Sequence, residues 1–443
     1  MSNVRQFILS LRLLCALPLL AVAIAGCGTS PARPPFVGEE MLMFQSPHGF
    51  FIATVRDGAV QVRQLPREHE PDRAWALSRS GKMIWKRKDG PFVELQLFER
   101  KLQARPLAKQ KRPGLPDGNR QFALSHDGRT LAYTTEDKDR KASLVCEDLA
   151  TGAVHTVVKG RICLIDPAWS PDGTRIAYYC MNDPEYSVGL SASCQAVLSL
   201  HVVDVATGKD RRVASPSKAS RSMSVGEFRD PPAWSPDGTE IAYYCTRDAK
   251  LAKEINRATE GVCLNIVNIA TGKDRRVAPP SQMTHQGGYD GEWRHSPVWS
   301  ATGDRLFFKA QYAPDGGRSS HTYQVAASGG SRPALIGWDV CWSASPTDGT
   351  LYATSGASVY GLTLAGNKVT RRTLITENGS QPKISPSGRV VAYAKQGFTW
   401  NRPVLYVRLL EEDRQLLVHN PVKECILQDI YWTIVPPPGK EKK

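Results

Sequence analysis

The sequence lacks the short motifs that mark the common catalytic and metal-binding sites. It contains no Gly-x-Ser-x-Gly, no His-Glu-x-x-His, no Gly-x-x-x-x-Gly-Lys-Ser/Thr and no Cys-x-x-Cys. These absences argue against a hydrolase nucleophile elbow, a zinc-protease helix, a phosphate-binding loop and a zinc ribbon or thioredoxin-like site. We therefore expect no cofactor and no metal, and we assign no catalytic residue, although a Ser-His-Asp set assembled from distant segments stays open.

Long apolar stretches are also scarce. The run at residues 13–25 follows Arg5 and Arg12, and it is too short to cross a bilayer comfortably as a helix. Its positive start and small residues are typical of an export signal. The ending Ile24-Ala25-Gly26-Cys27 resembles the lipobox of bacterial lipoproteins, which implies that Cys27 is acylated and becomes the new N-terminus. An ordinary cleaved signal with an incidental cysteine is the alternative.

The N-terminal segment is therefore expected to be a signal peptide at residues 1–26. Residues 27–40 then hold the lipidated cysteine and a tether that contains the stiff run Ser-Pro-Ala-Arg-Pro-Pro. Two or three acyl chains anchor firmly, because each buried CH₂ contributes about 0.8 kcal/mol. Gly28 stands where lipoproteins of the inner membrane often carry Asp, so we expect an outer-membrane location facing the periplasm.

One phrase recurs along most of the chain. Its complete form, Pro-Ala-Trp-Ser-Pro-Asp-Gly-Thr-Arg-Ile-Ala-Tyr-Tyr, occupies residues 167–179 and returns almost unchanged at residues 232–244. Each copy predicts a strand end, a tight turn and a second strand, because Pro fixes φ, Asp bonds nearby amides and Gly accepts positive φ. A spacing of about 40 to 65 residues fits a four-stranded propeller blade. Weaker copies centre on Ser78, Ser125, Ser300, Ser343 and Ser385.

The two ends of the chain complete one more blade. Residues 41–44, 50–55 and 59–65 have the pattern of three strands without an innermost one, and residues 429–432 have that of an innermost strand alone. A shared sheet would remove the exposed edges of an open array. We therefore predict an all-β fold, a single β-propeller at residues 41–435 with eight blades, closed by N- and C-terminal strands that share a blade. Seven blades are the alternative, and residues 436–443 form a basic tail.

The phrase Trp-Ser-Pro-Asp-Gly-x-x-Ile-Ala-Tyr resembles the WD-like repeat of TolB-type β-propeller proteins. The resemblance covers roughly residues 41–435 and implies the propeller fold. Repeats of this type occur in periplasmic scaffolds, in peptidase accessory domains and in lyases, so the resemblance leaves the function open.

Cysteine is infrequent, but its number suits export. Of ten cysteines, Cys15 leaves with the signal and Cys27 takes the lipid, so eight remain. An even number in an oxidising compartment favours disulfides, each contributing about 3 kcal/mol at most for a loop of this length. The first two pairs below occupy matching places in two copies of the repeat, the third follows from proximity and the fourth from elimination. The candidates are Cys180 with Cys194, Cys245 with Cys263, Cys146 with Cys163, and Cys341 with Cys425.

The chain is basic, with a formal net charge of +14. Such a surface favours anionic partners, namely lipopolysaccharide, acidic glycans, anionic headgroups or an acidic protein. The predicted compartment argues against nucleic acid. The pairs Arg211-Arg212 and Arg275-Arg276 recur on the fourth strand of two blades, where we expect a basic outer rim. A solvated surface that only keeps the protein soluble is the simpler interpretation.

Strand order assigns the connections to two faces. In an up-and-down blade the first and third turns lie on one face, whereas the second connection and the link to the next blade lie on the other. Residues 182–193, 215–230, 246–261, 279–295 and 312–320 are long connections of the second kind, and long loops on one sector commonly carry binding. Their histidines and carboxylates match no established metal signature. The candidate binding residues are His285, Tyr289, Asp290, Trp293, Arg294, His295, Arg221, Phe228 and Arg229.

These features predict a monomeric, lipid-anchored envelope propeller that binds a protein or an anionic glycan through its loop-rich face. The alternative is a propeller-type enzyme of the periplasm, a polysaccharide lyase or hydrolase, that uses His285, His295 and residues of the central channel. A mainly structural envelope protein is the third hypothesis.

Overall fold

The structure is a computed structural model that describes residues 39–435 with gaps. All described residues belong to one compact unit, Gly38–Lys443. Among them, no helix is long and apolar enough to cross a membrane. The larger segments outside the described residues are 66–74, 97–103, 107–121, 182–196, 219–231, 246–259, 283–296, 311–320, 397–402 and 421–427.

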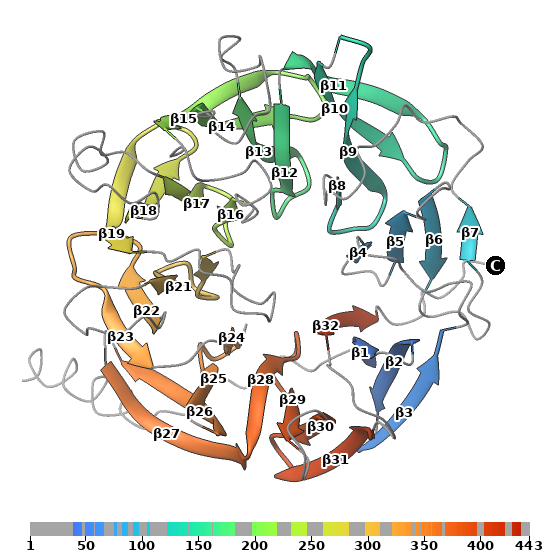
Figure 1. Ribbon diagram of the computed structural model, residues 1–443, viewed down its shortest axis with the longest axis vertical. Coiled ribbons are helices and arrows are strands. Elements are labelled where there is room, and N and C mark those ends of the chain that lie inside the picture. Colours follow the sequence, from blue (N-terminus) through green and yellow to red (C-terminus); the bar gives the residue numbers. More distant parts are fainter. Residues whose placement is uncertain are drawn as a thin grey trace, which may run out of the picture. The chain divides into compact units, whose positions relative to one another are not determined.

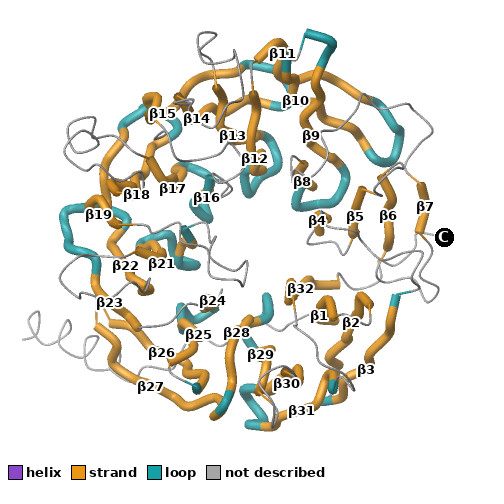
Figure 2. The backbone as a smooth tube through the Cα atoms, in the orientation of Figure 1, coloured by secondary structure: helices purple, strands orange, loops and turns teal. Residues whose placement is uncertain are grey.

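The described chain forms eight antiparallel sheets of four strands, and Figure 1 shows them arranged around a common centre. Seven of the sheets are each built from consecutive strands, so that the chain runs up and down within a blade. Among the described residues, Figure 2 shows only strands and the loops and turns that join them. The seven sheets are β4–β7 (Trp75–Leu77, Lys82–Lys86, Phe92–Gln96, Ala104–Pro106), β8–β11 (Phe122–Leu124, Thr130–Glu136, Ala142–Asp148, Val154–Arg161), β12–β15 (Cys163–Trp169, Arg175–Met181, Val197–Asp204, Asp210–Lys218), β16–β19 (Ala233–Trp234, Glu240–Cys245, Glu260–Asn268, Asp274–Gln282), β20–β23 (Val298–Trp299, Arg305–Ala310, His321–Ala326, Ala334–Gly337), β24–β27 (Trp342–Ala344, Leu351–Ser355, Ser358–Ala365, Lys368–Glu377) and β28–β31 (Gly379–Ile384, Val390–Gln396, Pro403–Leu409, Arg414–His419).

The eighth sheet joins the two ends of the described chain. Its order is β3-β2-β1-β32, with β1 at Glu39–Ser46, β2 at Gly49–Arg56, β3 at Ala59–Gln64 and β32 at Gln428–Val435. Strand β32 pairs antiparallel with β1, so that Leu42 faces Trp432, and Figure 1 shows these two strands side by side. The predictions of eight blades and of closure by a shared blade are therefore confirmed.

The repeated turn has the chemistry that its residues predict. Ser170 Oγ donates to Asp172 Oδ1 at 2.5 Å and accepts the N–H of Arg175 at 2.9 Å, while Asp172 Oδ1 also accepts the N–H of Thr174 at 3.1 Å. Gly173 takes a φ of 72°, which only glycine adopts readily. Partial burial opposes ionisation of Asp172, but these hydrogen bonds outweigh it and lower its pKa to about 2. Asp172 is thus a turn-forming residue.

For one copy of the repeat, the position that the sequence predicts is two residues too early. The phrase centred on Ser343 forms its turn at Ser345, whose N–H donates to Thr350 O at 2.8 Å. Ser343 lies within β24 instead, and its Oγ accepts the N–H of Ile384 in the next sheet at 3.2 Å. Two serines stand in this segment, and the phrase alone does not say which of them begins the turn.

The hydrophobic core lies between neighbouring sheets. One cluster joins Leu144 of β10 to Leu164 and Ile176 of the next blade, and similar clusters join the later blades in turn. Tryptophans at the end of the first strand link three of these interfaces, because each indole N–H donates to a backbone carbonyl of the preceding blade. The bonds run from Trp169 to Ala123 O at 3.0 Å, from Trp234 to Ala168 O at 3.0 Å, and from Trp299 to Ala233 O at 2.9 Å.

A buried carboxylate lies where the shared blade meets the preceding one. Glu40 of β1 is only 4% exposed, and its Oε1 accepts the N–H of Ser387 at 2.8 Å. Burial raises the pKa of Glu40 above its ordinary value, although hydrogen bonds from Ser387 and Ser385 and the charge of Arg389 work in the opposite direction. A charge on Glu40 is therefore disfavoured at this contact between the shared blade and the preceding one, the seam between the two.

Candidate functional site

The predicted binding residues lie outside the described residues. These are His285, Tyr289, Asp290, Trp293, Arg294, His295, Arg221, Phe228 and Arg229. The described strands fix where their connections begin and end, because each sheet is an antiparallel meander. Five links start at strand ends on the same face, and the bounds of the flanking strands make these links long. They are β13–β14, β15–β16, β17–β18, β19–β20 and β21–β22. The turns on the opposite face are short, such as the one between Asp204 and Asp210.

A Ser-His-Asp set does exist in the described chain, within a single blade. His201 of β14 lies between two partners, with Nδ1 3.2 Å from Asp210 Oδ1 and Nε2 3.1 Å from Ser199 Oγ. Arg161 of the preceding blade places Nη2 2.6 Å from Asp210 Oδ2. Burial opposes ionisation of Asp210, but the hydrogen bonds from His201, Tyr178 and Arg161 bring its pKa below the ordinary value. Tyr178 stacks on His201 with 5.6 Å between ring centroids.

This arrangement is a structural network. Ser199 is 4% exposed and His201 5%, so no substrate reaches the hydroxyl in this structure. The next blade repeats the contacts to the aspartate, with Asn265 in the place of the imidazole and Cys263 in the place of Ser199: Asn265 donates to Asp274 Oδ1 at 3.0 Å, and Tyr243 donates to Asp274 Oδ2 at 2.6 Å. In the matching place an amide therefore holds the aspartate as the imidazole does. In the sequence, residues 206–214 recur letter for letter as residues 270–278, and this recurrence signals the shared aspartate of the two blades.

The cysteines whose side chains are described form no disulfide. Cys146, Cys180 and Cys263 are buried thiols, and burial raises the pKa of Cys146 to about 12. No disulfide joins these three residues in this structure, although Cys263 stands directly opposite its predicted partner Cys245 on β17. Cys146 faces Ala132 and His155 across the neighbouring strands, so no cysteine stands opposite it. The side chains of the remaining candidates, Cys163, Cys194, Cys245, Cys341 and Cys425, lie outside the described residues.

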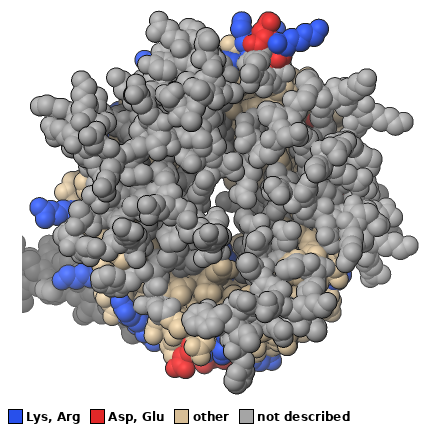
Figure 3. Space-filling model, in the orientation of Figure 1, with Lys and Arg blue, Asp and Glu red and all other residues tan. Residues whose placement is uncertain are grey.

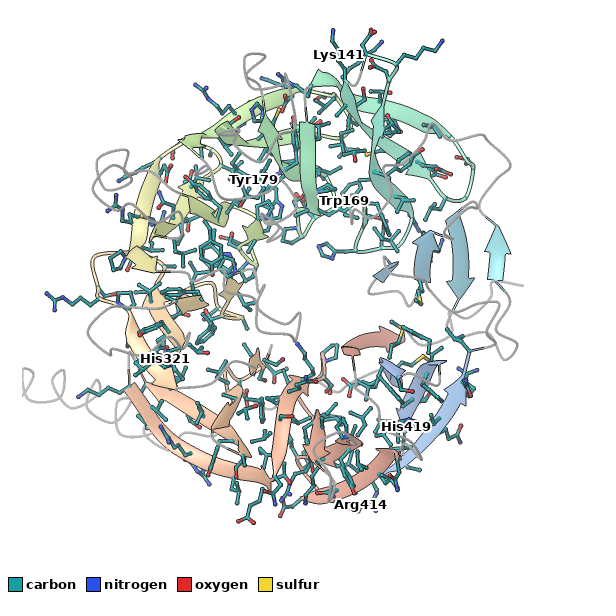
Figure 4. All side chains as sticks on the ribbon, in the orientation of Figure 1. Lys141, Trp169, Tyr179, His321, Arg414 and His419 are labelled. Carbon is teal, nitrogen blue, oxygen red and sulfur yellow. The ribbon has the colours of Figure 1, made fainter. Side chains whose placement is uncertain are left out.

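Arginines of the outer strands fall into two groups. Some tie one blade to the next: Arg275 donates to Ala327 O of the next blade at 2.9 Å, and Arg211 donates to Ile269 O. Within its own blade, Arg275 also holds Glu240 at 2.7 Å through both amino groups. Others, such as Arg212, are exposed. Figure 3 shows Lys and Arg side chains at the outer rim, and Figure 4 shows Arg414 there, with Trp169 on the inner side of its sheet. The predicted basic rim therefore exists, but half of each Arg-Arg pair joins blades.

No protein family and no curated protein matches the sequence. Similar solved structures include TolB from Acinetobacter baumannii, which is 18% identical over 79% of this chain and 81% of its own, with a TM-score of 0.32. An oligogalacturonate lyase in complex with manganese is 16% identical over 84% of this chain and 97% of its own, with a TM-score of 0.48. The β-propeller domain of the Trilobed protease from Pyrococcus furiosus is 12% identical over 84% and 95%, with a TM-score of 0.40. TolB-type propellers are thus among the structures that the chain resembles, and at such identities the likeness concerns the fold alone.

Proposed function

We propose that the protein is a lipid-anchored scaffold of the bacterial cell envelope, on the outer membrane and facing the periplasm. It binds an envelope protein or an anionic glycan through the face of the long connections. One observation carries the proposal: in three successive blades, the strands that border residues 182–196, 219–231, 246–259, 283–296 and 311–320 end on the same face, and indole hydrogen bonds and apolar clusters join these sheets. The formal charge of +14 supports an anionic partner. Acylation at Cys27 supplies the anchor.

The binding face is tested by replacing residues 283–296 with a Gly-Ser linker in the protein that starts at residue 28. The control inserts the same linker into the Thr271-Gly272 turn, which belongs to the opposite face. The variants are used to isolate partners from envelope extract, and the isolated species are identified by mass spectrometry. The proposal predicts that the loop replacement loses a protein or glycan that the turn insertion keeps. Equal recovery by both variants would contradict it.

The anchor and the enzyme alternative have separate tests. Labelled palmitate should enter the full-length protein and not its Cys27→Ser variant; label in both, or in neither, would remove the anchor from the proposal. Turnover of an acidic polysaccharide by the purified protein, lost in a His285→Ala/His295→Ala double variant, would overturn the scaffold in favour of a lyase or hydrolase.

A further inference from the structure

Strand β27 differs from the other outer strands of the ring. It is the longest described strand, with ten residues, and it lies at the end of its sheet. Its inner edge pairs with β26, in a register that runs from Ser358 opposite Glu377 to Ala365 opposite Lys368. Within the described chain no strand pairs with its outer edge. Its backbone therefore offers a row of N–H and C=O groups to an added strand.

In two other blades the outer strand contains prolines, which block such an addition. Strand β15 contains Pro216, and β19 contains Pro279 and Pro280, whereas β27 contains no proline. A proline has no N–H to donate and is a common means of closing an exposed edge. Five consecutive residues of β27, from 370 to 374, are exposed, and Leu374 is 45% exposed. Strand β11 has at most three exposed residues in a row.

The charges on this edge select the partner. Arg371 and Arg372 are exposed, and within the described chain no carboxylate or carbonyl accepts from them, in contrast to Arg275 and Arg211. As successive residues of a strand they stand on opposite faces of the sheet, one on each side of the edge. A second copy of β27 would bring arginine against arginine, and like charges placed opposite each other destabilise a strand pair. An acidic segment would instead place a carboxylate opposite each arginine, so that opposite charges attract on both faces of the sheet.

We propose that the open edge of β27 is a docking site that takes an acidic, extended segment of a partner protein as a fifth strand of this blade. Backbone hydrogen bonds supply the pairing, and two adjacent acidic residues of the segment meet Arg371 and Arg372. An apolar residue of the segment covers Leu374. The site lies on the outer rim, so it is independent of the face that carries the long connections.

The probe is a synthetic peptide of Thr and Val with two adjacent Glu residues at its centre, measured by fluorescence anisotropy against the full-length protein. In the Arg371→Glu/Arg372→Glu variant its affinity should fall about tenfold or more, since two cross-strand charge pairs become repulsive. The matched control, Arg212→Glu/Arg276→Glu, makes the same charge change on the proline-containing strands and should lose less than about threefold. A Lys-Lys version of the peptide should bind the Arg371→Glu/Arg372→Glu variant, which also shows that this variant is folded.

Backbone pairing is tested by N-methylation. Methyl groups on alternate residues block one edge of the peptide, so of two versions, methylated at odd or at even positions, one should lose binding and the other keep it. If both bind as tightly as the parent, or if both arginine variants weaken the peptide equally, the attraction is one of charge alone and the proposal fails. A sedimentation shift of the protein alone, abolished by Arg371→Glu/Arg372→Glu, would make a second copy the occupant and would equally overturn it.

Discussion

The indole hydrogen bonds between blades give a quantitative prediction for Trp299→Phe. Trp299 is 8% exposed, and its Nε1 donates to Ala233 O of the preceding blade at 2.9 Å. A phenyl ring keeps most of the contact with the cluster around Leu264 and Leu306 but leaves the carbonyl without this donor. Ala233 is only half-buried, so losing this hydrogen bond costs about 0.5–1.5 kcal/mol, and the smaller ring loses about 1 kcal/mol of apolar burial. The free energy of unfolding should therefore fall by about 1.5–2.5 kcal/mol.

The assay is a urea titration followed by circular dichroism, with Val298→Ala as the control. Val298 precedes Trp299 on the same strand and is 39% exposed, so its truncation should change the free energy of unfolding by less than about 0.5 kcal/mol. Trp169 makes the equivalent bond in a sheet that is not adjacent, and the double variant Trp169→Phe/Trp299→Phe should be additive within about 0.5 kcal/mol. If Trp299→Phe is no less stable than Val298→Ala, the indole bonds do not hold the blades together.

Three further predictions concern the seam, the buried network and the turns. Because burial raises the pKa of Glu40, its contribution to stability is lost as pH rises from about 4.5 through the folded-state pKa. The Glu40→Gln variant should therefore be more stable than the wild type at pH 7 and equal to it near pH 4. Urea titrations from pH 4 to 8 measure this difference. His201→Asn should cost less than about 1 kcal/mol, since the next blade uses Asn there, whereas Asp210→Ala should cost about 2–4 kcal/mol by leaving buried donors without their acceptor. Gly173→Ala and Gly388→Ala both place a side chain at a positive φ, which costs about 1 kcal/mol of stability. Of the two, only the methyl added at Gly388 overlaps a neighbouring side chain. Thermal unfolding should therefore show that Gly388→Ala loses about 1–3 kcal/mol more stability than Gly173→Ala.

Local chemistry explains why most of the fold could be predicted. The turn between Ser170 and Arg175 is specified by its own serine, aspartate and glycine, and each copy of the phrase therefore marks two strands. The closing strand was found because residues 429–432 look like a first strand with nothing after it, and its pairing with β1 bears this out. Both conclusions need only contacts close in sequence or an unmatched piece of a repeat.

Contacts between blades could not be predicted in the same way. Arg275 was expected to point outward, yet Glu240 and a carbonyl of the next blade hold it. The number and spacing of cysteines suggested bridges, but a thiol such as Cys146 fills apolar space as well as any small side chain. The function of the long connections likewise depends on side chains outside the described residues, and the sequence pattern supplies only their place.

The measurement that tests the central claim most directly is residue-resolved hydrogen exchange of β1 in the full-length protein. In a closed ring, β1 lies between β2 and β32, so the residues from Glu40 to Met43 pair with a strand on each side and their amides should all exchange slowly. Removing residues 428–443 should then make alternate amides of β1 exchange fast, because one edge of the strand is opened. If the full-length protein already shows this alternation, β32 does not pair with β1, and the ring is not closed in the way described.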